Sequence, residues 1–137
     1  MLDIGAGEGA LTAHLVRAGA RVVAVELHPR RAALLRERFP GITVVHADAT
    51  AIPLPGRPFR VVANPPYGIS SSLLRILLAP GSRLVAADLV LQRAVARKNA
   101  DGAPRRFTST VGLTLPRHAF VPPPHVDSAV LVVRRRR

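Results

Sequence analysis

The segment at residues 3–10, Asp-Ile-Gly-Ala-Gly-Glu-Gly-Ala, constrains the fold of this chain more than any other segment. It follows a short apolar run at residues 1–4, which is typical of a strand. It precedes residues 10–18, where apolar side chains recur on one helical face. Alternate glycines let the backbone turn tightly here, and the unpaired N–H groups of a helix start favour anionic ligands. The segment therefore predicts a strand–turn–helix unit with a ligand at the turn. A sharp turn with no ligand is the alternative.

Short β-branched runs alternate with helical patterns along most of the chain. Strands are expected at residues 22–25, 42–45, 60–63 and 84–91, and helices at residues 29–38, 70–78 and 92–98. Runs of this kind are typical of parallel strands buried on both faces, so the pattern predicts a doubly wound α/β sheet. Further strands are expected at residues 108–115 and 129–133, joined by a proline-rich stretch that is neither helix nor central strand. We therefore expect the fold to close with an antiparallel hairpin.

The length and charge of the chain bound its organisation. The 137 residues fit one domain over 1–137, and its first strand is so short that we expect an N-terminally truncated domain. Arginine and lysine outnumber the acids by 20 to 8, which gives a net charge of +12. Such a domain associates with polyanions, with nucleic acid as the first candidate and a membrane surface as the second. We expect an exposed basic loop at residues 102–106 and a frayed basic tail at residues 134–137.

The sequence also argues against a metal site, a membrane span and a signal peptide. The chain has no cysteine and its histidines stand singly, so we expect no metal. It has no apolar run of membrane-spanning length and no signal-peptide pattern at its start, so we expect a soluble, cytoplasmic protein. The oligomeric state cannot be read from the sequence, and a monomer is the default expectation.

Three of the eight acids, Asp3, Glu26 and Asp48, are expected at the carboxyl ends of successive strands beside the glycines. Glu26 can accept hydrogen bonds from both hydroxyls of a ribose, and Asp48 can accept one from an adenine amino group. This arrangement favours a nucleoside site over solvated strand-end acids. By itself it fits either a dinucleotide or S-adenosyl-L-methionine, because Gly5, Gly7 and Ala10 also satisfy the dinucleotide fingerprint.

The sequence Asn64-Pro65-Pro66-Tyr67 after the fourth strand decides between these cofactors. An amino nitrogen conjugated to a ring is a poor nucleophile, so an enzyme that methylates it must hold its hydrogens and aim its lone pair. The side-chain oxygen of Asn64 and the carbonyl of Pro65 can accept those hydrogens, and Tyr67 offers a face for stacking. The motif therefore favours nitrogen methylation over a proline-rich turn with an incidental tyrosine.

Together with two further motifs, these segments resemble the rRNA adenine N6-dimethyltransferase family. The shared motifs, in chain order, are Asp3 to Thr12, Val25-Glu26, Ala47-Asp48-Ala49, Asn64 to Tyr67, Leu91-Gln92-Arg93 and Phe120 to Ser128. The resemblance implies a class I, Rossmann-like methyltransferase domain that uses S-adenosyl-L-methionine on an adenine in a single-stranded or loop region of rRNA. Among the family's branches, the glycine segment looks closest to the enzymes that confer macrolide resistance by modifying 23S rRNA.

The resemblance also implies roles for single residues. The target adenine would be held by Asn64, Pro65, Tyr67 and Phe120. The cofactor would be held by Asp3, Gly5, Gly7, Gly9, Glu26, Asp48 and Asn64. Arg105, Arg106, Arg117 and the arginines at 134–137 are expected on the target side, where they would hold RNA.

One departure from the family keeps other substrates open. The family's tetrad usually has leucine or isoleucine where this chain has Pro65, and Asn-Pro-Pro-Tyr is familiar from DNA adenine and protein glutamine methyltransferases. The alternatives are therefore DNA-adenine or protein-glutamine methylation, modification of small-subunit rRNA, and a non-catalytic RNA-binding fragment.

Overall fold

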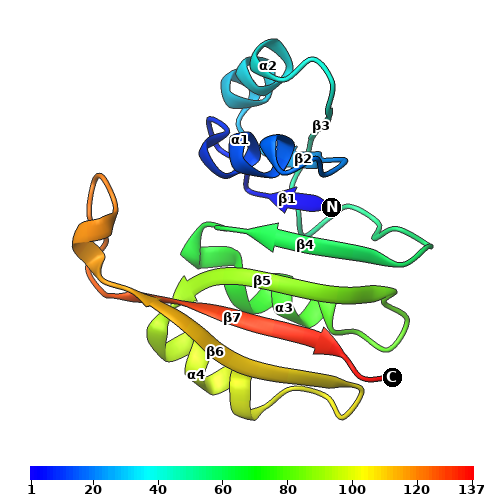
Figure 1. Ribbon diagram of the computed structural model, residues 1–137, viewed down its shortest axis with the longest axis vertical. Helices are drawn as coiled ribbons and strands as arrows, with labels where there is room; N and C mark the ends of the chain where they lie inside the picture. The colour runs from blue at the N-terminus through cyan, green and yellow to red at the C-terminus, as the bar shows by residue number, and fades with distance from the viewer.

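The computed structural model describes residues 1–137 as a seven-stranded sheet with helices packed against it (Figure 1). The strands are β1 (Leu2–Ile4), β2 (Val23–Glu26), β3 (Thr43–His46), β4 (Phe59–Ala63), β5 (Leu84–Gln92), β6 (Phe107–Leu115) and β7 (Ser128–Arg135). The helices are α1 (Ala10–Arg17), α2 (Pro29–Arg38), α3 (Ser70–Leu77) and α4 (Arg93–Asp101), with short 3₁₀ turns η1 (Tyr67–Ile69) and η2 (Arg117–Ala119).

The strand order is β3-β2-β1-β4-β5-β7-β6. The first five strands are parallel, and β7 runs antiparallel to both β5 and β6. The predicted parallel sheet with a C-terminal antiparallel hairpin is therefore confirmed. The strand order reverses between β1 and β4, and ligands of open α/β sheets bind beyond the carboxyl ends of strands at such a point.

The helices cover different parts of the sheet. In Figure 1, α1 and α2 lie at the β1–β3 end, whereas α3 and α4 lie behind β5, β7 and β6. The main core is built from β4, β5, β7 and α3, and Leu77, Leu89 and Leu131 are fully buried in it. A smaller core joins Leu35 of α2 to β2. No helix is both long and apolar enough to cross a membrane.

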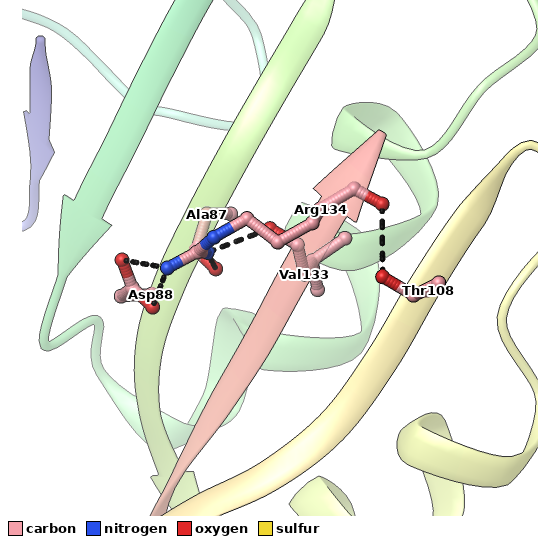
Figure 2. Close-up of polar contacts among 5 residues, drawn as sticks. All are labelled: Ala87, Asp88, Thr108, Val133 and Arg134. Atoms are coloured by element: carbon pink, nitrogen blue, oxygen red, sulfur yellow. Dashed lines mark hydrogen bonds and ion pairs between the residues drawn. The ribbon is translucent and has the colours of Figure 1, made fainter. Parts of the chain in front are cut away.

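The expectation of a frayed basic tail is wrong for its first half, because β7 extends through Arg135. Figure 2 shows the guanidinium of Arg134 lying beside the carboxylate of Asp88 on β5, with nitrogen–oxygen distances of 3.1 and 3.2 Å. Arg135 donates to the carbonyls of Leu84 and Ser82, both at 2.6 Å. Arg134 is therefore held by the Asp88 carboxylate in the middle of β5, and Arg135 by carbonyl oxygens at and just before the start of that strand.

The loop at residues 102–106 is also less exposed than predicted. Arg106 is half-buried, donates to the carbonyl of Leu78 after α3, and lies 5.3 Å from the ring centre of Phe107. Arg135 lies over the same ring at 4.8 Å. Both arginines therefore tie the hairpin to the rest of the domain.

Candidate active site

A cavity of about 440 Å³ opens at the carboxyl edge of the parallel strands, where the strand order reverses. Its walls come from the segments that follow β1, β2, β3 and β4, together with the proline-rich segment between β6 and β7. Its volume falls within the range of pockets that take small-molecule ligands and cofactors. The topology therefore brings the predicted motifs to one place.

The glycine loop after β1 contributes Gly5 and Gly7 to the cavity. Both have left-handed backbones, with φ of 69° and 60°. A Cβ on Gly5 would lie 3.0 Å from Cδ of Pro66 and 3.4 Å from Cα of Pro65, whereas one on Gly7 would meet nothing closer than 4.0 Å. Gly5 thus lets the glycine loop touch the Asn64–Tyr67 segment, and Gly7 leaves room for a ligand.

Two residues expected to bind the cofactor do not line the cavity. Gly9 is buried at the start of α1, where a Cβ would lie 2.6 Å from the ring of Phe39, so this glycine is required by helix packing. Asp3 is only 1% exposed and lies within β1. The cofactor contacts implied for these two residues stay predictions, since the Cβ direction of Gly9 and the side chain of Asp3 face protein atoms.

Asp3 instead takes part in a buried hydrogen bond. The hydroxyl of Thr12 on α1 donates to its carboxyl oxygen at 2.5 Å. Burial raises the pKa of Asp3, the hydrogen bond from Thr12 opposes the rise, and the charge of Glu26 adds to it. This hydrogen bond joins β1 to α1, so Asp3 stabilises the glycine loop that connects them.

Glu26 ends β2 and lines the cavity, as the sequence predicts. The backbone N–H of Gly7 donates to one carboxylate oxygen at 2.8 Å, and that of His28 donates to the other at 2.9 Å. Each oxygen retains a lone pair for a ribose hydroxyl. The glutamate therefore also holds the glycine loop, a role that residue spacing alone does not reveal.

Asp48 lies two residues beyond β3 and also lines the cavity. The N–H and the hydroxyl of Thr50 donate to the same carboxylate oxygen at 2.9 and 2.7 Å. Both hydrogen bonds lower the pKa of Asp48, and the bond from the Thr50 hydroxyl has the larger effect. The carboxylate is therefore ionised, and its second oxygen is not engaged by Thr50.

The segment predicted to hold the target base also lines the cavity. Asn64 is exposed at the cavity, Pro65 is buried beside it, and Tyr67 is half-buried. The hydroxyls of Tyr67 and Ser128 lie 2.7 Å apart, which ties η1 to the start of β7. Phe120 lines the same cavity from the proline-rich segment. All four residues predicted to hold the target base therefore line one cavity.

Sequence reasoning missed three cavity residues, Leu27, Arg31 and Ile69. Leu27 is 64% exposed and follows Glu26 directly, and Arg31 reaches the cavity from α2. An apolar side chain of this exposure offers a flat ligand a contact surface. Leu27 could have been predicted, because a large apolar residue directly after a strand-end acid lies next to the expected ligand. The position of Arg31 in the sequence does not indicate that it lines the cavity.

Most of the arginines assigned to the target side lie elsewhere. Arg105 and Arg106 precede β6, and residues 134–137 end β7, so they lie at the opposite edge of the sheet from the cavity (Figure 1). The error arises because β7 runs antiparallel, which carries its carboxyl end away from the site. Only Arg117, on η2, lies at the expected edge.

Comparison with known proteins agrees with this geometry. The model of the ribosomal RNA adenine dimethylase family matches residues 1–137. The mycinamicin-resistance protein MyrB of Micromonospora griseorubida is 39% identical over 99% of this chain and 47% of its own length. Ribosomal RNA small subunit methyltransferase A of Leifsonia xyli is 36% identical, over 98% of this chain and 56% of its own length.

A solved structure gives the same fold. The crystal structure of 23S rRNA methyltransferase ErmE superposes with a TM-score of 0.88 and 34% identity, covering 98% of this chain and 60% of that one. The methyltransferase fold expected from the sequence is thereby confirmed. The chain spans about half the length of the curated relatives it matches.

Proposed function

The chain belongs to the ribosomal RNA adenine dimethylase family, and we propose that it transfers a methyl group from S-adenosyl-L-methionine to the exocyclic N6 of an adenine in rRNA. The observation that carries the proposal is the close approach of Gly5 to Pro66, whose Cδ lies 3.0 Å from where a Cβ on residue 5 would stand. This contact joins the glycine loop to the Asn64–Tyr67 segment, so that one cavity has a nucleoside-binding wall and a base-binding wall.

The cofactor side of the cavity suits the nucleoside of S-adenosyl-L-methionine. Glu26 would accept hydrogen bonds from the ribose hydroxyls, and the ionised Asp48 would accept one from the adenine amino group. Leu27 would pack against the adenine ring, and the open space at Gly7 leaves room for the methionine portion. When bound, the cofactor supplies a methyl group on a sulfonium whose sulfur leaves as a neutral thioether.

On the other wall, this chain's residues hold and orient the target base. The Asn64 side-chain oxygen and the Pro65 carbonyl accept the two N6 hydrogens, which draws the nitrogen lone pair out of conjugation with the ring. Tyr67 and Phe120 stack on the base, and stacking of this kind contributes roughly 1–3 kcal/mol per base. After methyl transfer, N6 would release one of its two protons to water.

Within this activity we propose 23S rRNA as the substrate, with macrolide-type resistance as the outcome. The similarity to a mycinamicin-resistance protein and to a 23S rRNA methyltransferase supports this branch. The similarity to small-subunit methyltransferases supports the runner-up, 16S rRNA.

The proposal is tested with radiolabelled S-adenosyl-L-methionine and purified 23S and 16S rRNA. The wild-type chain is expected to label 23S rRNA, and Asn64→Ala is expected to lose on the order of 100-fold or more in rate. Asn99→Ala is the matched control, since Asn99 lies on α4 and donates to the carbonyl of Val95. Circular dichroism and thermal unfolding establish that each variant folds.

The outcomes separate the parts of the proposal. Labelling of 16S rRNA alone would move the substrate to the small subunit. Full activity of Asn64→Ala would remove Asn64 from the mechanism. No labelling of either rRNA, with saturable cofactor binding intact, would reject the proposed substrate class.

A further inference from the structure

A second cavity, of about 550 Å³, opens beside the candidate active site at the same edge of the sheet. Its floor is the end of β5 and the first turns of α4, with Gln92, Arg93 and Arg97. Its far wall is formed by Arg117 and by residues 125–127. Figure 1 shows the connection between β6 and β7, which carries that wall, beside the ends of the parallel strands.

The proline-rich segment between β6 and β7 separates the two cavities and lines both of them. Phe120, Pro122 and Pro124 line the active-site cavity, and the next residues along the chain, from His125 to Asp127, line the second cavity. A strand that delivers a base to the first cavity therefore has its backbone within reach of the second.

The charge of the second cavity is not balanced within the protein. Arg93, Arg97 and Arg117 are exposed, and none of them forms an ion pair, since the one ion pair of the structure joins Arg134 to Asp88. Arg93 and Arg97 are four residues apart on α4, a spacing at which like charges destabilise a helix. The first turn of α4 contains no acid, so the positive end of the helix dipole adds to the same field.

The single acid in the cavity serves to hold its walls together. A carboxylate oxygen of Asp127 accepts the backbone N–H of Arg117 at 2.7 Å, and its carbonyl accepts the backbone N–H of Arg93 at 3.0 Å. Asp127 thus fixes two arginine-bearing segments relative to each other without pairing with either guanidinium.

We propose that Arg93, Arg97 and Arg117 form a phosphate-binding cleft that holds the backbone of a single-stranded RNA next to the target adenosine. Guanidinium groups bind phosphate oxygens in a bidentate manner, and three unpaired ones in a cleft suit a chain of phosphodiesters. The cleft gives the RNA a defined path on one side of the base cavity. This inference rests on the proposed function, because it takes the substrate to be RNA.

The test compares two triple variants with the same net charge. The cleft variant carries Arg93→Gln, Arg97→Gln and Arg117→Gln. The control carries Arg21→Gln, Arg57→Gln and Arg83→Gln. These control arginines are exposed and lie just before β2, β4 and β5, at the edge of the sheet away from the cavities.

Binding of a fluorescent single-stranded RNA that contains the target adenine is measured by anisotropy at several NaCl concentrations. Loss of three phosphate contacts is expected to make the slope of log affinity against log salt shallower by about 2, which corresponds to on the order of 100-fold weaker binding at 0.1 M salt. The control triple is expected to bind within about threefold of wild type, because only long-range charge is lost.

Equal weakening by both triples would overturn the cleft, since net charge alone would then explain binding. Wild-type RNA affinity in the cleft variant would also overturn it. Methyl transfer and calorimetric cofactor binding are measured on the same proteins. RNA binding that depends on the cleft without methyl transfer would leave the cleft standing and reject the proposed function. Methyl transfer with an unchanged KM for RNA in the cleft variant would keep the proposed function and reject the cleft.

Discussion

The hydrogen bond between Tyr67 and Ser128 joins two motifs that lie 61 residues apart in the chain. Ser128 is fully buried as the first residue of β7, where it pairs with Gln92 of β5. A phenol held in this way cannot swing freely out of the cavity. The serine at the end of the Phe120–Ser128 motif therefore positions the tyrosine rather than contacting a substrate.

This link predicts coupled effects of Tyr67→Phe and Ser128→Ala. Tyr67→Phe leaves a buried serine hydroxyl without a partner, so it is expected to destabilise the fold by about 1–3 kcal/mol. Each substitution is expected to lower kcat/KM for methyl transfer by on the order of tenfold, because the ring loses its fixed orientation. The double variant should lose little more than either single one.

Urea unfolding and initial rates on the four proteins measure this cycle. Ser109→Ala is the control, since the hydroxyl of Ser109 is buried without a partner and its removal is expected to be neutral or slightly stabilising. Additive losses in the double variant would show that the two hydroxyls act independently.

At the scale of elements, local patterns in the sequence were sufficient for the sheet and its helices. Residues 29–38 begin with proline, which is preformed for the first helical position, and that helix has the expected bounds. The position of β7 between β5 and β6 could not be predicted, because it depends on tertiary pairing. Arg134 and Arg135 were predicted at the wrong edge of the sheet because the position and direction of β7 were not known from the sequence. The assignment of Gly9 and Asp3 to the cofactor stays a prediction, and the spacing of the loop does not show that both residues face the protein interior.

The contact between the glycine loop and the Asn64–Tyr67 segment predicts a specific effect of Gly5→Ala. The new methyl group would lie 3.0 Å from Cδ of Pro66, so the loop that carries Asn64 must shift. Backbone strain at φ 69° adds a cost of about 1–2 kcal/mol in stability. We expect a loss of methyl transfer on the order of tenfold, because Pro66 must give way by a few tenths of an ångström beside Asn64.

Gly19→Ala serves as a control that separates backbone strain at a positive φ from displacement of the Asn64–Tyr67 segment. Gly19 has a φ of 84° and no atom within 4 Å of an added Cβ, so this variant carries only the backbone strain. Thermal unfolding should move similarly in both variants, while methyl transfer should fall only in Gly5→Ala. Equal activity of the two variants would mean that the contact with Pro66 does not position Asn64.

At the scale of the whole molecule, the net charge of +12 has one short-range compensation, the exposed pair between Arg134 and Asp88. An exposed pair of this kind contributes little to stability. Repulsion among the excess positive charges is therefore not compensated by nearby acids, and such repulsion destabilises a compact state. The charge that favours a polyanionic partner thus opposes folding when no such partner is bound.

This balance predicts opposite responses to salt. From 0.02 to 0.2 M NaCl the screening length falls from about 20 Å to about 7 Å, so the Tm of the free protein should rise, by on the order of 3 °C. Over the same range RNA affinity should fall, because releasing the same counterions into a more concentrated salt solution gains less entropy. The variant with Arg21→Gln, Arg57→Gln and Arg83→Gln should melt higher at low salt and respond less to added salt, since it carries three fewer positive charges. Scanning calorimetry of both proteins across the salt series measures the effect. A Tm that falls as salt is added would mean that attractive pairs outweigh repulsion in this fold, and that its excess arginines are compensated at longer range.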